Sequence, residues 1–189
     1  GVAAHWRYKN PTDSNSEDMP WLTNIVDWQN ETDDPEEFME TLKVDLEQDE
    51  VYVFTPKGDV ITLATRATPI DFAYAIHTRI GSACVSAKVD GIRVPLWTRL
   101  RNGQSVQIVT AEGQTPPANW IDIAATGRAK TAIRRSLREA DREKFINLGR
   151  EFARVAFENV NKKATDRALS TAAKHFGLPS ADELLARLG

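Results

Sequence analysis

The stretch TPIDFAYAIHTRIG, from Thr68 to Gly81, decides the fold, because it is the helical segment between two expected β-hairpins. Thr68 is a suitable helix N-cap, Pro69 fits the first turn, and Asp71 stands three residues after the cap, as in a capping box. Gly81 is a residue that commonly ends a helix. The sequence therefore predicts one short helix over 68–81.

Extended segments lie on both sides of this helix. The first hairpin joins VYVF to VITL through the turn TPKGD, and the second joins CVSAKV to IRVPL through Asp90-Gly91. Pro95 restricts its strand to a short or edge position, and SVQIVT alternates strictly as a last strand. The order of two strands, a helix and three strands predicts an α+β domain over 51–112, with the ubiquitin-like β-grasp fold.

The helical wheel of 68–81 separates a buried arc from a solvent-facing arc. The apolar arc is expected to face the sheet and contains Phe72, Ala73, Ile76 and Ile80. His77 lies at its edge, about 100° from Ile76, and Tyr74 and Thr78 lie farther toward solvent. A half-exposed imidazole at this edge can stack or donate a hydrogen bond. The alternative is a partly buried histidine bonded to a backbone carbonyl.

Charge divides the chain into three parts. Residues 1–50 carry a net charge of −11, residues 51–112 carry +3, and residues 113–189 carry +5. We interpret 1–50 as the end of a preceding domain followed by two acidic connecting helices, from about Trp21 and from about Pro35. We expect the third part, 113–189, to be a truncated helical domain. After a linker over 113–119 we expect helices over 120–138, 141–160 and 164–176, and a short one capped by Ser180.

A basic stripe is expected on the first of these C-terminal helices. Its members lie within roughly 80° of one another on a helical wheel: Arg128, Arg135, Arg138 and Arg142. Such a stripe suits the RNA backbone or another acidic partner, through salt-sensitive contacts. The alternative is an ordinary solvated helix face with local glutamate pairs.

Several classes of function lack their sequence signals. No apolar run approaches the ~20 residues of a membrane span. The single cysteine, Cys84, excludes an internal disulfide framework and fits a reducing cytoplasm. The histidines at 5, 77 and 175 are too dispersed for a metal cluster, and neither a P-loop nor a nucleophile elbow occurs. We therefore expect no catalytic residue, metal or cofactor, and a binding role in the cytoplasm.

Three segments of the sequence resemble a known family. VYVFTPKGDVITL, TPIDFAYAIHTRIG and AKVDGIRVPLWTRLRNGQSVQIVT resemble the TGS domain of the long RelA/SpoT stringent-response proteins. GVAAHWRYK resembles the end of that family's (p)ppGpp synthetase domain, and NWIDIAATGRAKTAIRRSLRE the start of its helical domain. The resemblance implies a regulatory, non-catalytic piece of a bacterial GTP pyrophosphokinase and (p)ppGpp hydrolase, whose active sites lie elsewhere.

The resemblance also implies partners. In ribosome-bound relatives a histidine of the motif matched by IHTRIG contacts the 3′ CCA end of deacylated tRNA. This role falls on His77, with Tyr74, Thr78 and Arg79 as neighbours. Ala75 stands where some ribosome-dependent members have a second histidine.

Two other partners stay open at this point. Other family members bind acyl carrier protein, and the basic side chains of the β-grasp domain suit that acidic partner as well: Arg79, Arg93, Arg99 and Arg101. In a third interpretation, the acidic helices within 21–50 pack on basic helices within 128–160. The region would then relay signals between the other domains of the same chain.

Overall fold

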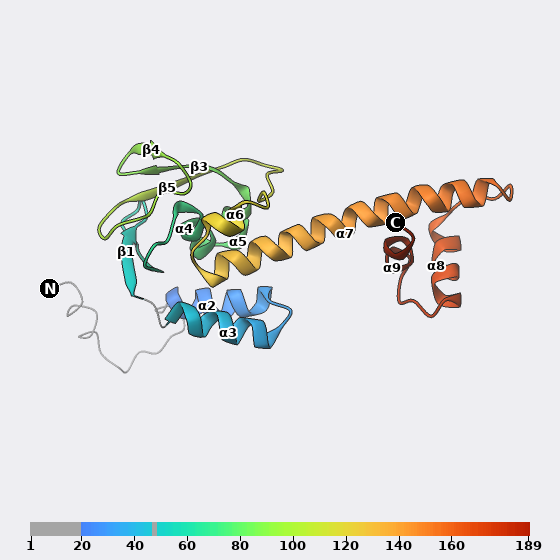
Figure 1. Cartoon of the computed structure of the whole chain (residues 1–189), viewed down its shortest axis with the longest axis horizontal. Helices are drawn as coiled ribbons and strands as arrows, with labels where there is room; N and C mark the ends of the chain where they lie inside the picture. Colours follow the sequence, from blue (N-terminus) through green and yellow to red (C-terminus); the bar gives the residue numbers. More distant parts are fainter. Residues whose placement is uncertain (1–19, 47–48) are drawn as a thin grey trace. The chain divides into compact units, whose positions relative to one another are not determined.

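The computed structural model describes residues 20–46 and 49–189, so the expected end of a preceding domain in 1–19 lies outside the described residues. The chain forms two compact units. Of the described residues, the first unit contains 20–46, 49–114 and 122–130, and the second contains 115–121 and 131–189. Figure 1 shows the order of the elements along the chain.

The first unit begins with two acidic helices, α2 (Pro20–Glu31) and α3 (Pro35–Leu46), at the positions predicted. The two helices lie side by side (Figure 1). They meet through Trp28 and Phe38, which are buried with ring centroids 5.0 Å apart in an edge-to-face arrangement. Asp34 caps α3, because its carboxylate accepts the backbone N–H of Glu36 at 2.9 Å.

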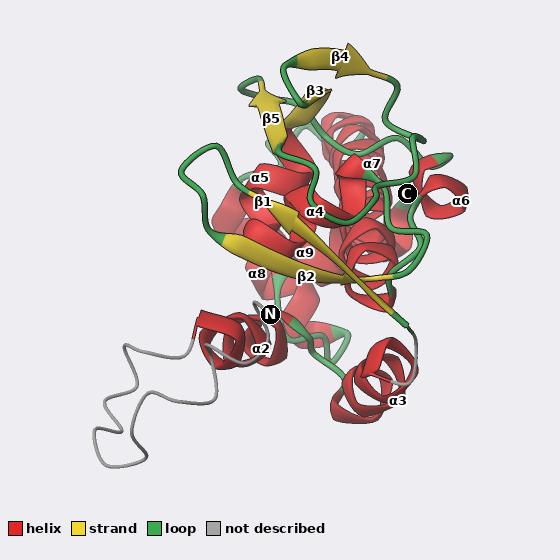
Figure 2. Ribbon diagram, turned by 90° about the vertical axis from the view of Figure 1, so that its left-hand side faces the viewer, coloured by secondary structure: helices red, strands yellow, loops and turns green. Residues whose placement is uncertain are grey.

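Both predicted hairpins are present (Figure 2). In the first, β1 (Glu50–Phe54) pairs antiparallel with β2 (Val60–Ala64). In the second sheet the strand order is β4-β3-β5, formed by β3 (Cys84–Val89), β4 (Ile92–Val94) and β5 (Val106–Thr110). Asp90 and Gly91 have φ values of 50° and 80°, as a tight hairpin turn requires. β4 ends before Pro95 and lies at an edge, as predicted.

The two sheets are joined between β1 and the segment before β5. Phe54 and Ser105 form a parallel bridge, and the Phe54 N–H donates to the Gln104 carbonyl at 2.8 Å. One core lies between the sheets and the helix that follows β2, and its buried members are Val51, Val53, Leu63, Ala67, Phe72, Val89, Leu100 and Val106. The α+β, β-grasp prediction is confirmed.

The central helix differs from the prediction in one respect. It begins at Thr68–Pro69 as expected, but α4 (Pro69–Ile76) stops at His77 and a second helix, α5 (Thr78–Ala83), follows. His77 is extended, with φ −167° and ψ 144°, and serves both as the last cap of α4 and as the first cap of α5. The single helix predicted over 68–81 is therefore wrong at its middle.

This break also changes which side chains are buried. Tyr74 is fully buried and Ile76 is 37% exposed, the reverse of their places on a regular helical wheel. Gly81 lies inside α5 instead of ending it, and a Cβ at this position would overlap the Tyr74 ring. Glycine is therefore needed at 81 for close approach to that ring.

The helices α6 (Trp120–Ile123), α7 (Gly127–Glu158), α8 (Asp166–His175) and α9 (Ala181–Leu188) follow (Figure 1). The predicted helices over 120–138 and 141–160 are wrong, because α7 is one helix of 32 residues and contains no glycine or proline between Arg128 and Leu148. Ser180 caps α9 as predicted, accepting the Glu183 N–H at 3.2 Å.

The second unit has its own apolar core. Ala153 of α7, Leu169 of α8 and Leu185 of α9 are buried against one another. A Cβ at Gly149 would overlap the Leu185 carbonyl, so this glycine allows α9 to approach α7. Among the described helices of both units, none combines the length and apolar character needed to cross a membrane.

Candidate functional site

His77 is an exposed side chain at the junction of α4 and α5. Its backbone N–H donates to the Ala73 carbonyl at 3.2 Å, which closes α4. Its Nδ1 accepts the backbone N–H of Arg79 at 3.0 Å, which caps α5. A neutral imidazole whose Nδ1 accepts carries its proton on Nε2. The ring is therefore oriented by the backbone, and its Nε2–H is a hydrogen-bond donor available at the surface.

The three predicted neighbours of His77 have different environments. Arg79 is exposed, whereas Thr78 is half-buried and its hydroxyl donates to the Glu31 carboxylate of α2. Tyr74 is buried, with its hydroxyl 3.4 Å from the Ser82 hydroxyl, and burial raises the pKa of Tyr74 to about 12. The structure thus brings His77, Thr78 and Arg79 together and excludes Tyr74 from the surface.

Asp71, in the first turn of α4, is 1% exposed and its carboxylate accepts bonds from two directions. Oδ2 accepts the N–H of Thr68 at 2.8 Å and its hydroxyl at 3.0 Å, which is the predicted carboxylate arm of the capping box. Oδ1 accepts the N–H and the hydroxyl of Thr126, each at 2.8 Å, and the Ala125 N–H lies 3.0 Å from both oxygens. This carboxylate joins α4 to the start of α7.

The start of α7 is also bonded to α3 and, a second time, to α4. The Asp45 carboxylate of α3 accepts the backbone N–H of Gly127 at 2.9 Å and of Arg128 at 3.4 Å, where the helix dipole favours an anion. Burial raises the pKa of Asp45 above 3.8, although these two N–H groups act in the opposite direction. The Arg128 guanidinium donates through Nη1 to the Ala75 carbonyl at 3.4 Å.

The predicted arginine stripe is not uniform. Arg128 is half-buried in the first unit and bonds to α4, so its predicted place on an exposed face is wrong. Arg135 forms an ion pair with Glu139 at 3.1 Å, and Arg142 forms one with Glu183 at 3.4 Å. Arg138 is exposed. Local carboxylates therefore neutralise part of the stripe, as the alternative interpretation of a solvated face expects.

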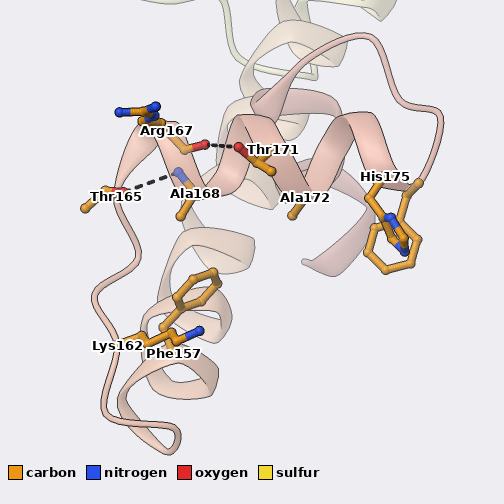
Figure 3. A pocket seen from close by; sticks show the side chains of 9 residues that line it. Phe157, Lys162, Thr165, Arg167, Ala168, Thr171, Ala172 and His175 are labelled. Atoms are coloured by element: carbon orange, nitrogen blue, oxygen red, sulfur yellow. Dashed lines mark hydrogen bonds between the residues drawn. The ribbon is translucent and has the colours of Figure 1, made fainter.

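The second unit contains an open hollow of about 540 Å³ along α8, which the sequence analysis did not predict (Figure 3). Figure 3 shows Phe157 and Lys162 on one side, and Arg167 and His175 toward the two ends of α8. The His175 and Phe176 rings lie edge to face with centroids 5.6 Å apart. Positive and aromatic side chains thus line the hollow together with alanines and threonines.

Two further features bear on catalytic chemistry, namely the environment of Cys84 and the arrangement of potential metal ligands. Cys84 is fully buried, and burial raises its thiol pKa to about 11, which disfavours the reactive thiolate. Within residues 20–46 and 49–189, no group of three or more His, Cys, Asp or Glu side chains is arranged to hold a metal ion.

Comparison with known sequences assigns two parts of the chain to known domains. A sequence model of the TGS domain matches residues 51–110, and a model of the RelA/SpoT AH domain matches residues 136–189. The chain belongs to the RelA/SpoT family. Its β-grasp domain is a TGS domain, and its C-terminal helices form an AH domain.

Relatives with similar sequence support this assignment. The chain is 42% identical over 196 residues to the GTP pyrophosphokinase of Myxococcus xanthus, and 43% identical over 199 residues to the GTP pyrophosphokinase rsh of Brucella ovis. Both matches cover 100% of this chain and 26% of the relative. The bifunctional (p)ppGpp synthase/hydrolase RelA of Mycobacterium tuberculosis is 42% identical over 163 residues, covering 80% of this chain and 22% of the relative. The chain spans about a quarter of the length of these relatives.

The sequence predicted a surface position for His77, which is exposed, but did not indicate the long-range bonds that join α4 to the start of α7. The bonds of Asp71 to Ala125 and Thr126 join positions 54 and 55 residues apart, and no local pattern indicates them. A signal for the start of α7 did exist. Thr126 is a favourable N-cap residue, and its hydroxyl accepts the Ala129 N–H at 3.2 Å.

Proposed function

We propose that this region is a regulatory, non-catalytic module that senses deacylated tRNA through its 3′ CCA end, with His77 as the principal contact. The observation that carries the proposal is the exposed imidazole of His77, oriented by the Arg79 N–H at 3.0 Å. An oriented ring loses little freedom when a ligand binds, which favours affinity.

The chemistry of a single-stranded RNA end fits this site. An unpaired base can stack on the exposed ring, and Nε2–H can donate to a ribose or phosphate oxygen. Arg79 is exposed two residues away and supplies a positive charge for the phosphate backbone. Tyr74 is not part of the proposed contact because its ring is buried.

The proposal extends to the longer protein to which such a region belongs. Relatives bear the names GTP pyrophosphokinase and bifunctional (p)ppGpp synthase/hydrolase. We propose that the catalytic sites of the longer protein lie outside the present chain. We propose also that this protein acts in the cytoplasm of a bacterium. The region would then report tRNA bound at the ribosome to those catalytic domains.

A second candidate is supported by a different surface of the TGS domain. Ile92 on the edge strand β4 is 70% exposed, and Trp97 just after it is 68% exposed. Arg93, Arg99 and Arg101 are exposed in the same stretch of sequence. Apolar anchors with positive neighbours suit an acidic protein, and acyl carrier protein is the candidate.

Binding measurements separate the two candidates. Replacement of His77 by alanine should weaken binding of an uncharged tRNA about 10-fold or more and leave capture of purified acyl carrier protein unchanged. Trp97→Ala should show the opposite pattern if the acidic protein is the partner. Equal tRNA affinity of the parent chain and His77→Ala would refute the tRNA contact.

The AH domain adds a salt-dependent test. Arg138→Ala removes an exposed charge and should reduce the slope of log affinity against log salt by about 1 if this arginine contacts a phosphate. An unchanged slope removes Arg138 from the RNA interface and leaves the stripe as a solvated helix face.

A further inference from the structure

The break between α4 and α5 redirects one backbone hydrogen bond. In an unbroken helix, the N–H of Arg79 would donate to the Ala75 carbonyl, four residues earlier. Here that N–H donates to His77 Nδ1 at 3.0 Å instead. The Ala75 carbonyl therefore lacks the donor that a continuous helix would give it. The Arg128 guanidinium reaches the same carbonyl, with Nη1 at 3.4 Å.

The other end of α4 is bonded to the same short segment. Asp71 lies in the first turn of α4, and its carboxylate accepts from the Ala125 N–H and from both donors of Thr126 at 2.8–3.0 Å. Arg128 follows two residues later and bonds near the last turn of α4. Residues 125–128 thus contact α4 at both ends, and α4 is only 8 residues long.

We propose that residues 125–128 clamp α4 and hold the break at His77, so that Arg128 is a positioning residue for the exposed imidazole. The clamp rests on the proposed function only in assigning tRNA as the ligand of His77. Two arrangements compete at this junction. In the broken arrangement, Arg128 bonds to Ala75 and His77 caps α5; in a continuous helix, Arg79 takes the Ala75 carbonyl and Nδ1 of His77 loses its donor.

The clamp makes the coupling between His77 and α7 reciprocal. A movement of residues 125–128 away from α4 removes the bond that exists only in the broken arrangement. A ligand that binds the exposed His77 ring favours the broken arrangement. Because Ala75 and Asp71 of α4 bond to residues 125–128, the same ligand also favours the arrangement in which the start of α7 is bonded to α4. Asp45 of α3 accepts from Gly127 and Arg128 at this same start, so α3 belongs to the bonded set.

The first test measures the conformation of His77 without RNA. Arg128→Met keeps a long apolar stem and removes the donor, and Arg138→Met is the matched control that removes an exposed arginine from the same helix. By NMR, we expect the His77 Cα shift to move from extended toward helical values in Arg128→Met and to stay unchanged in Arg138→Met. An unchanged His77 shift in Arg128→Met, with the β3–β5 amide signals intact, overturns the clamp.

A conservative variant guards against simple loss of folding. Arg128→Lys retains the positive charge but not the guanidinium that reaches the Ala75 carbonyl, and should move the His77 shift only part of the way toward helical values. If the β3–β5 signals of Arg128→Met are lost, Arg128→Lys decides alone. An intermediate His77 shift supports the clamp, whereas a shift equal to that of the parent chain, together with unchanged Arg79 amide exchange, contradicts it.

The second test is a double-mutant cycle with an uncharged tRNA ending in CCA as the probe. Arg128→Met should weaken binding about 10-fold in the parent background and by less than about 2-fold in the His77→Ala background, because a positioning residue acts through His77. Equal losses in both backgrounds mean that Arg128 contacts RNA itself and overturn the positioning role. If His77→Ala binds tRNA normally, the proposed function fails, and the NMR test still decides the clamp.

Discussion

Replacement of Asp71 by asparagine tests whether one buried carboxylate joins the TGS domain to the start of α7. The side chain is 1% exposed, and its two oxygens accept from Thr68, Ala125 and Thr126 at 2.8–3.0 Å. In asparagine one oxygen becomes an NH₂ donor. Whichever way the amide turns, either the Thr68 N–H or the Thr126 N–H then faces another donor.

The magnitude follows from this donor count. One buried N–H left without an acceptor costs about 1–3 kcal/mol. The remaining bonds lose the assistance of a negative charge, which is roughly 1 kcal/mol for each of about two bonds. We therefore expect Asp71→Asn to lower the unfolding free energy of the first unit by about 3–5 kcal/mol.

The assay is urea unfolding followed by amide exchange at β3 and β5, because the two units of the chain can unfold separately. Asp122→Asn is the matched control, since Asp122 is an exposed carboxylate in the first turn of α6 and its loss should cost less than about 0.5 kcal/mol. A change for Asp71→Asn within about 0.5 kcal/mol of that control would refute the assigned role of this carboxylate.

Three further predictions concern packing and ionisation. Gly81→Ala places a Cβ against the buried Tyr74 ring and should lower the unfolding free energy by about 1–3 kcal/mol; a neutral effect in urea unfolding would contradict this packing. Cys84 has its pKa raised from 9.0 to about 11, so its alkylation by iodoacetamide at pH 8 should be about 100-fold or more slower than that of an unfolded thiol; comparable rates would contradict its burial. Burial raises the pKa of Asp45 above 3.8, so the folded state binds this proton more tightly than the unfolded state does. The resulting stabilisation is present at low pH and is lost as pH rises through the raised pKa. The stability of the parent chain relative to Asp45→Asn should therefore fall with rising pH across this acidic window in urea titrations, and a rise would contradict the sign.

The strands and turns of the TGS domain were predictable because their signals are local. Asp90-Gly91 adopts positive φ at both residues, and Thr68-Pro69 starts α4, as their chemistry requires. The break at His77 was not predictable from periodicity. It depends on the His77 side chain, which accepts the backbone N–H of Arg79 two residues later. It depends also on Arg128, which bonds to the Ala75 carbonyl 53 residues earlier in the chain.

The burial of Tyr74 was not predictable for the same reason, because a regular helix through 68–81 would turn this side chain toward solvent. The second helix instead brings Gly81 against the Tyr74 ring and buries it. His77 was correctly identified as a surface residue, but its oriented ring follows from the capping bond to Arg79 and not from its place on the wheel.

The central claim is that His77 contacts the terminal nucleotide of an uncharged tRNA. The most direct measurement compares two tRNAs, one with a complete CCA end and one lacking the last adenosine, for binding to the parent chain and to His77→Ala. We expect removal of the adenosine to weaken binding to the parent chain by about 10-fold or more, in line with the loss of one stacked base, and to leave binding to His77→Ala almost unchanged. An equal loss in both proteins would contradict it.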